Sequence, residues 1–319
     1  GLENVSLADI SVRCIEGKAC SSAEMADAIG LELSLAKQMG KHALVHVVHG
    51  SKTGLILPEL AEIDRLREDF GDSFTLVVDA CQARIMSDAI AEYLKRDAIV
   101  LLTGSEFMGG APFSGFALVP VRTIAEAAPL PEGFMSIFRR AEWPHSWAGV
   151  VQLENTENPG LALRLEASVF ELERFQKLSL DEVTRVIFAF QHVLRRALLE
   201  PFGFELVQPH SGNVDDETRE HPLEMLTLAT LDVSTHPVSH DFAGAEILHR
   251  TLAMNGIRLG QPVKSVRTSE GKWGGTLRVG LSMPQMVRLA AHDDAALESA
   301  LAIDLGRIAT ALEEQRAVS

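Results

Sequence analysis

Two carboxylates follow apolar segments of the kind that form buried strands, so a sheet would deliver both to its rim. Asp79 stands at the end of segment 74–80 (FTLVVDA), and Gln82 comes three residues after it. A carboxylate in a poorly solvated site favours a positive charge beside it. Asp is also a favoured N-cap residue, so capping of the helix that follows is the alternative interpretation of Asp79.

The second carboxylate, Glu106, follows segment 98–104 (AIVLLTG), which has Thr103 near its end and Ser105 directly after it. The glycines of the loop 108–115 (MGGAPFSG) allow a tight turn and a close approach of the backbone to an anion. An ordinary polar loop before a strand has the same composition. An anion site and a plain connection therefore both stay open.

Helical and strand-like segments alternate through the first part of the chain. Helices are expected at 23–39, 57–71 and 84–96, and strands at 43–48, 74–80 and 98–104. Apolar strands separated by helices indicate an α/β fold with a mainly parallel sheet flanked by helices on both faces. Because ligands bind at the carboxyl ends of such strands, the sequences HGSKTG, VDACQ and TGSE are expected along one rim.

The pattern changes after residue 128, where Pro, Gly and aromatic residues become frequent. Helices are expected at 160–175, 180–201, 243–257 and 293–316, and strands at 223–233 and 275–282. We predict a large α/β domain at 1–128, a helical connection completing it at 129–222, and a smaller α+β C-terminal domain at 223–319.

Several segments together resemble a known family. VVDACQARI and LLTGSEFMGGAPFSGFALVP are similar to the active-site core of fold-type I pyridoxal 5'-phosphate (PLP) enzymes, specifically the class V aminotransferase group. This group includes aminotransferases, cysteine desulfurases and kynureninases. Residues 45–63 (VHVVHGSKTGLILPELAEI) resemble the preceding strand, and MNGIRLGQPV and TLRVGLS resemble parts of the small C-terminal domain.

The resemblance assigns roles to particular residues. It implies that Asp79 keeps the pyridine nitrogen of PLP protonated, which makes the cofactor an electron sink, and that Gln82 hydrogen-bonds the ring hydroxyl. Thr103 and Ser105 lie where the family has a phosphate-binding hydroxyl and a residue packed against the ring. Arg278 matches the region where many relatives grip the substrate carboxylate, and a surface ion pair is its alternative role.

Glu106 departs from the family, which has at this position the lysine that forms the Schiff base with PLP. Glutamate cannot form an imine, and its charge near Asp79 is unfavourable in a poorly solvated site. Three explanations stay open: a pseudoenzyme or divergent paralogue, a lysine that was altered or lost from the sequence, or replacement by Lys52. Lys52 lies on the same predicted rim but suits an exposed turn, because lysines are rarely buried.

A second departure concerns the residues that precede Thr53, which number about fifty. The family has a glycine-rich phosphate cup and a ring-stacking aromatic residue well upstream of this point, and neither is found here. The resemblance therefore implies a large domain that is incomplete at its N-terminal end.

Composition excludes several classes of protein. The 319 residues carry a net charge of −15, whereas nucleic-acid binding needs clustered Lys and Arg. The three cysteines include no CxxC pair, which argues against a disulfide scaffold and a zinc ribbon. No apolar run approaches the roughly 20 residues of a membrane span. Without a signal-peptide pattern, the expected location is cytoplasmic.

A metal-dependent hydrolase is a separate hypothesis. His210, His221, His236 and His240 lie among the acidic residues Asp215, Asp216, Glu217 and Asp241, which together offer ligands for a divalent metal. The spacing of these residues matches no tight ligand motif. His42 and His46 share a face of their predicted strand while His49 points to the other, so no metal site is expected there.

The leading hypothesis is a PLP-dependent transferase-like protein that acts on an amino-acid or amine substrate, most similar to a class V aminotransferase. Relatives of this kind are homodimers, so a homodimer is expected. The alternative is a non-catalytic descendant that keeps the fold for binding or assembly.

Overall fold

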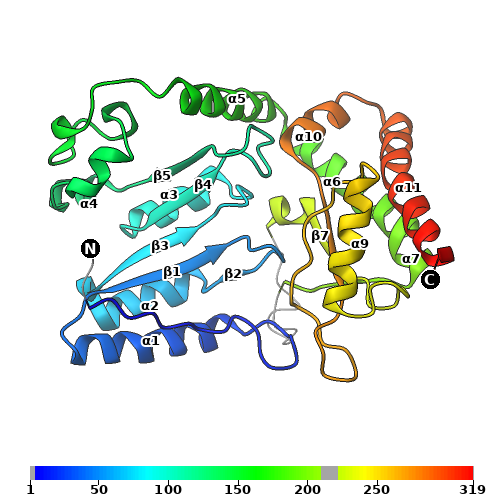
Figure 1. Ribbon diagram of the computed structural model, residues 1–319, viewed down its shortest axis with the longest axis horizontal. Helices are drawn as coiled ribbons and strands as arrows, with labels where there is room; N and C mark the ends of the chain where they lie inside the picture. The colour runs from blue at the N-terminus through cyan, green and yellow to red at the C-terminus, as the bar shows by residue number, and fades with distance from the viewer. Residues whose placement is uncertain (1–3, 210–221, 319) are drawn as a thin grey trace.

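The computed structural model describes residues 4–209 and 222–318 (Figure 1). Its strands are β1 (Ala43–His49), β2 (Ile56–Leu57), β3 (Phe74–Asp79), β4 (Ile99–Thr103), β5 (Gly115–Leu118), β6 (Glu205–Leu206), β7 (Leu228–Asp232) and β8 (Thr276–Gly280). Its longer helices are α1 (Ser22–Gln38), α2 (Leu60–Phe70), α3 (Ser87–Lys95), α5 (Pro159–Phe175), α6 (Leu180–Leu194), α9 (Phe242–Met254), α10 (Met283–Ala290) and α11 (Asp294–Val318). The short helices α4 (Val121–Glu126) and α7 (Glu200–Phe202) complete the set of labelled helices.

The N-terminal half is built on a five-stranded sheet with the strand order β2-β1-β3-β4-β5. β1, β3 and β4 run parallel, whereas β2 and β5 pair antiparallel at the two edges. The central strands form where the sequence is continuously apolar, and the α/β prediction with a mainly parallel core is confirmed.

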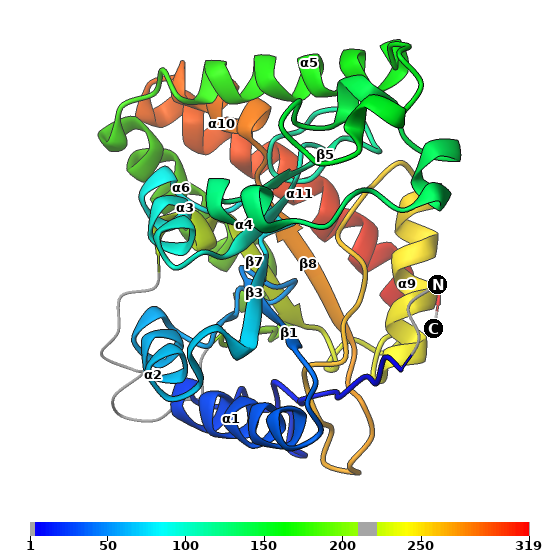
Figure 2. The same cartoon turned by 90° about the vertical axis from the view of Figure 1, so that its left-hand side faces the viewer.

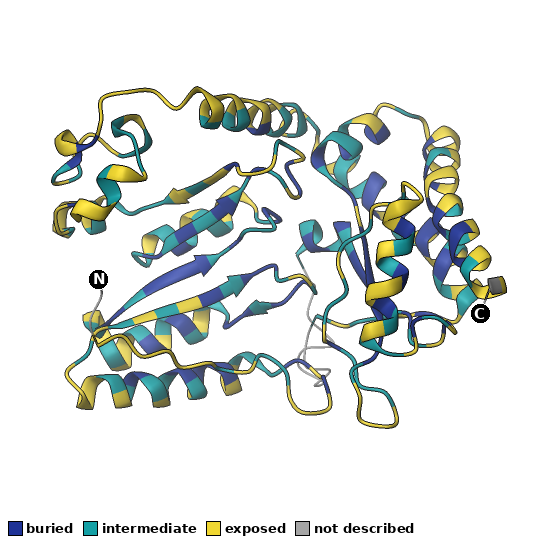
Figure 3. Ribbon diagram, viewed as in Figure 1, coloured by how far each residue is buried: buried dark blue, intermediate teal, exposed yellow. Residues whose placement is uncertain are grey.

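One face of this sheet is covered by helices and the other is largely open. On the covered face, Val47, Leu76 and Val100 share a buried cluster with residues of α1, α2 and α3. The opposite face of β1 carries Leu44, which is 67% exposed. Parts of the β1 ribbon have the colour of exposed residues (Figure 3). Asp79 lies on this open face too, because it pairs in register with Val48, four residues along from Leu44. The expectation of helices on both faces is therefore corrected for the described residues.

The C-terminal half is organised around a three-stranded antiparallel sheet with the order β6-β7-β8. Residues of α6, α9, α10 and α11 pack with these strands in the largest buried cluster. In Figure 2, α5 lies along α10 at one end of the molecule. Capping boxes at Ser179–Glu182 and Ser282–Gln285 define where α6 and α10 begin.

The predicted connection at 129–222 is divided between the two halves. β6 pairs with β7, and α6 packs against α11, so this part of the connection shares a core with the C-terminal strands. Within the described residues, no helix combines the length and apolar character that crossing a membrane requires.

Candidate active site

The turn after β3 is hydrogen-bonded to the end of the neighbouring parallel strand β4. Oδ1 of Asp79 accepts a hydrogen bond from the backbone N–H of Cys81 at 2.9 Å, and Oγ1 of Thr103 donates to the Cys81 carbonyl at 2.5 Å. Asp79 does not cap α3, because the N-cap residue of that helix is Met86. These bonds hold Asp79 and Thr103 at the rim, on the open face of the sheet.

The pKa of the Cys81 thiol depends on the negative charges at this rim. Burial raises the pKa of its thiol to about 12, and the hydrogen bond to Asp79 and the negative charges of Asp79 and Glu106 act in the same direction. The thiol is therefore protonated at neutral pH and is a poor nucleophile. Both carboxylates act on this one side chain.

Arg84 connects the rim to the C-terminal half. Its Nε donates to Oγ1 of Thr227 at 2.9 Å, and its Nη2 donates to the carbonyl of Leu281 at 3.1 Å. Its Nη1 donates to Oε1 of Gln82 at 3.3 Å. The guanidinium lies 4.8 Å from the centre of the Phe107 ring. Arg84 is thus a buried polar link between the two halves.

Glu106 is placed by the residues that follow it. It is exposed, whereas Phe107 and Met108 are buried in the largest cluster of the C-terminal half. The carbonyl of Phe107 also accepts a 2.7 Å hydrogen bond from the backbone N–H of Met283, at the start of α10. The loop therefore holds the Glu106 carboxylate at the junction of the two halves.

The glycines on either side of Glu106 are explained by a close contact with α5. A Cβ atom on Gly104 or Gly110 would overlap with Oγ of Ser168, which is fully buried on that helix. The N–H of Gly110 donates to the carbonyl of Gly104 at 2.8 Å, which closes the loop. In this structure the glycine-rich backbone approaches a helix.

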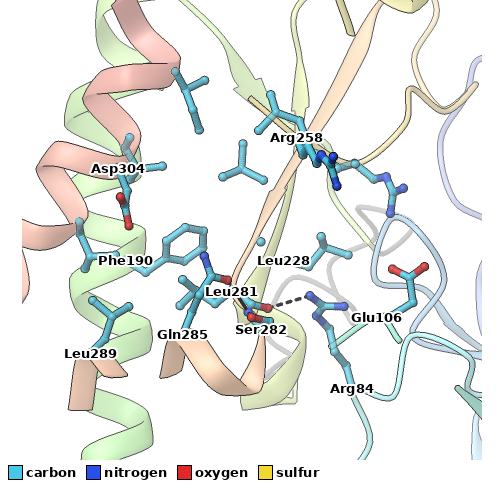
Figure 4. A pocket seen from close by; sticks show the side chains of 18 of the residues that line it. Arg84, Glu106, Phe190, Leu228, Arg258, Leu281, Ser282, Gln285, Leu289 and Asp304 are labelled. Carbon is cyan, nitrogen blue, oxygen red and sulfur yellow. Dashed lines mark hydrogen bonds between the residues drawn. The ribbon is translucent and has the colours of Figure 1, made fainter. Parts of the chain in front are cut away.

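A cavity of about 280 Å³ lies between the rim and the C-terminal helices (Figure 4). Gln82, Arg84, Glu106, Arg258 and Arg278 contribute polar groups to its wall. Figure 4 shows the Glu106 carboxylate on the same side of this cavity as the guanidinium groups of Arg84 and Arg258.

Buried guanidinium groups dominate the electrostatics of this cavity. Burial lowers the pKa of Arg84 to about 10, with the nearby positive charge of Arg278 acting in the same direction. Burial likewise lowers the pKa of Arg278. The negative charge of Glu106 opposes both shifts, so this carboxylate stabilises two cations that the fold has removed from water.

The structure brings together part of the predicted site. Gln82, Glu106 and Arg278 line the cavity, whereas Asp79, Thr103 and Ser105 belong to the adjoining strand ends and do not line it. Lys52 is exposed and is not part of the cavity wall. The backbone carbonyl of Gln261 accepts a 3.0 Å hydrogen bond from Nε of Arg278.

Arg84 and Arg258 are the functional residues that the sequence did not reveal. Arg84 stands at the start of the expected helix 84–96, where an arginine is ordinary, and the observed helix begins only at Ser87. Arg258 follows the end of α9, in the segment MNGIRLGQPV that resembles the small domain, but the resemblance assigned it no role. Thr227 and Leu281, which bind Arg84, lie more than a hundred residues away in the sequence.

The metal hypothesis finds no support in the described part of the chain, which holds no cluster of three or more metal-ligating side chains. Nε2 of His236 lies 3.1 Å from the carbonyl of Leu312, and its Nδ1 accepts from the N–H of Val238. His210, Asp215, Asp216, Glu217 and His221 lie outside the described residues.

No protein-family model and no curated protein matches the sequence. Solved structures do match. A NifS-like protein has a TM-score of 0.51 and 14% identity, and the match covers 91% of this chain and 66% of that protein. The cysteine desulfurase CsdA from Escherichia coli has a TM-score of 0.51 and 17% identity over 88% of this chain and 62% of its own.

A cysteine desulfurase from Thermococcus onnurineus gives a TM-score of 0.50 at 16% identity, over 93% of this chain and 64% of that one. The chain thus spans slightly less than two thirds of the length of each of these proteins. At such identities the matches establish the arrangement of the backbone. The chain therefore has the fold of the class V group of fold-type I PLP-dependent enzymes, as its sequence resemblance predicted.

Proposed function

We propose that this protein is a PLP-binding, transferase-like protein that takes an amino-acid or amine substrate and derives from class V aminotransferases. The observation that carries the proposal is a single cavity lined by Gln82, Glu106 and Arg278, beside the strand ends that hold Asp79 and Thr103. The resemblance assigns the cofactor to Asp79, Gln82 and Thr103. It assigns the substrate carboxylate to Arg278, and the position of Glu106 to the Schiff-base lysine.

The residues of the rim fit the non-covalent part of a PLP site. Asp79 would hold the pyridine nitrogen, and Gln82, whose 3.3 Å bond to Arg84 is long, can turn its amide toward the ring hydroxyl. Thr103 would bind the phosphate, which requires its hydroxyl to exchange its bond to Cys81, and Ser105 would pack against the ring. Bound PLP supplies an electron sink for charge that develops on the substrate.

Arg278 is the proposed partner of the substrate carboxylate. It is buried, it lines the cavity, and its Nε is fixed by the carbonyl of Gln261. A guanidinium held in this way presents its remaining N–H groups in a fixed orientation, which suits two parallel hydrogen bonds to a carboxylate.

Glu106 limits which steps of PLP chemistry the protein can carry out. A carboxylate can accept or donate a proton but cannot attach a cofactor through an imine. We therefore expect non-covalent PLP binding and no transaminase turnover by the sequence as it stands. The second candidate function, a non-catalytic binding protein, is favoured by the charge that Glu106 supplies to Arg84 and Arg278.

The test is an intact mass measured before and after incubation with PLP and reduction with borohydride, together with a PLP titration followed by fluorescence. The native protein should show saturable binding that Asp79→Asn weakens, and no added mass. Glu106→Lys should gain the mass of one reduced cofactor, whereas the exposed control Glu132→Lys should not. Absence of saturable binding in both the native protein and Glu106→Lys would disprove the cofactor proposal.

A further inference from the structure

The cavity at the junction has two chemically different ends. Near the rim, Arg258 and Arg278 contribute guanidinium groups. On the opposite side, Phe190 of α6 and Leu289 of α10 contribute apolar surface. Figure 4 shows Phe190 and Leu289 on the helical side of the cavity, away from Glu106. A ligand that fills the cavity therefore meets a cationic and an apolar region.

The cationic end is suited to a carboxylate. Among the residues that the structure describes, no hydrogen bond or ion pair engages the terminal nitrogens of Arg278 or the guanidinium of Arg258. Burial also lowers the pKa of Arg278 and the negative charge of Glu106 opposes this only in part, so a ligand carboxylate beside Arg278 offsets more of the cost of removing its charge from water. Two guanidinium groups offer a carboxylate more hydrogen bonds than either offers alone.

The apolar end is suited to a hydrocarbon chain. Phe190, Leu301 and Leu305 are at most 3% exposed and have no polar side-chain atoms, so a polar group there would lose its hydration without replacement. Asp304 lines the same end and pairs with Arg288 at 3.2 Å. A second carboxylate on the ligand would meet this negative charge, which disfavours a dicarboxylate.

We infer that the cavity binds a monocarboxylate with an unbranched or aliphatic apolar chain, its carboxylate between Arg258 and Arg278 and its chain toward Phe190 and Leu301. The volume of about 280 Å³ accommodates roughly nine water-sized groups at ~30 Å³ each, which corresponds to a chain of medium length. The inference rests on the proposed function, because it takes this cavity as the substrate site and describes the carboxylate and the apolar side chain of the amino-acid substrate.

The test is calorimetric titration of the full chain, without PLP, with acetate, butyrate, hexanoate, hexylamine and omega-aminohexanoate. Each buried methylene should tighten binding about fourfold, so hexanoate should bind about fifteenfold more tightly than butyrate, and hexylamine should not bind. Equal affinity for acetate and hexanoate would overturn the inference. Tighter binding of omega-aminohexanoate than of hexanoate would also overturn it, because the ammonium group would then be bound by Asp304 at the end assigned to the apolar chain.

Matched variants locate the two ends. Because Arg258 is exposed, Arg258→Met should weaken hexanoate binding about two- to fivefold, whereas Arg250→Met, an exposed arginine of α9 outside the cavity, should leave it unchanged. Ile308→Phe fills the apolar end and should weaken hexanoate more than acetate. Ile303→Phe, exposed on the same helix, is its control, and the unfolding temperature of each variant verifies folding.

If Ile308→Phe does not fold, Leu305→Ala tests the same end by enlarging it, and the preferred chain should become longer. If neither variant changes how affinity depends on chain length, the hydrocarbon chain lies elsewhere and the assignment is overturned. PLP titration of the same samples separates the two proposals. Chain-dependent carboxylate binding without PLP binding keeps this inference and removes the cofactor, and PLP binding without chain dependence does the reverse.

Discussion

At the scale of single residues, Glu106 stands where the resemblance implies a lysine, and the difference concerns the charge of the site as well as its reactivity. Glu106 is exposed, so its interaction with the two buried arginines is screened by solvent. We expect Glu106→Gln to lower the free energy of unfolding by about 1 kcal/mol or less. Urea unfolding of the two proteins at low and high salt checks this, and the difference should shrink in high salt.

Cys81 provides a second measurement at this scale. Because its thiol has a pKa of about 12, iodoacetamide at pH 8 should modify the exposed Cys14 and leave Cys81 unmodified in the folded protein. Glu106→Gln removes one of the negative charges that raise this pKa, so the pH at which Cys81 reacts should fall. Peptide mapping after alkylation across a pH series gives both results. Equal rates for the two thiols at pH 8 would contradict the rim geometry.

The residues that the sequence could predict are those with local signals. Asp79 and Thr103 stand at the ends of apolar strands, and such strand ends meet at one rim of a parallel sheet. Arg84 could not be predicted, because its role depends on Thr227 and Leu281, which lie 143 and 197 residues further along. Hydrogen bonds of that span leave no periodic or compositional signal.

At the scale of secondary structure elements, the two faces of the N-terminal sheet differ in what they contribute to stability. Leu76→Ala, on the covered face, should lower the free energy of unfolding by about 2–5 kcal/mol because it leaves a cavity. Leu44→Ala, on the open face, should change it by less than about 0.5 kcal/mol. Denaturant unfolding at protein concentrations that keep the chain monomeric compares them, and a large effect of Leu44→Ala under these conditions would contradict the open face.

The loop that carries Glu106 depends on its contact with α5. Gly110→Ala places a Cβ against Ser168 and should lower the unfolding temperature and displace the loop, whereas Gly133→Ala, where the space is open, should have little effect. Thermal unfolding followed by circular dichroism distinguishes the two variants. Equal unfolding temperatures would mean that the loop does not pack on the helix in solution.

Most helices and strands were predictable because their apolar pattern is regular. The elements whose type or bounds differ from the expectation do so for physical reasons. The expected strand 223–233 begins as a 3-10 turn at Leu223–Thr227, and only Leu228–Asp232 is paired. The expected helix 180–201 becomes a π-turn at Arg195–Leu199 before α7. β6 has two residues, which is too short for alternation to show. α10, with Pro284 in its first turn, was not predicted.

At the scale of the whole molecule, the resemblance implies a homodimer, and the open sheet face offers apolar surface such as Leu44. We propose that this face lies at or near the contact between two copies. Light scattering coupled to size-exclusion chromatography should give twice the mass of the 34.7 kDa chain. Leu44→Lys should shift the protein toward monomer without changing its helical content, and a monomeric native protein would contradict the proposal.

The anchoring of Phe107 and Met108 has a mechanical consequence. Asp79 is fixed to the N-terminal sheet, whereas Glu106 moves with the C-terminal core because its two following residues are buried there. A rotation of one half against the other changes the separation of the two carboxylates and strains the hydrogen bonds from Arg84 to Thr227 and Leu281. Such a rotation alters the electrostatic potential at the Cys81 thiol, on which both carboxylates act.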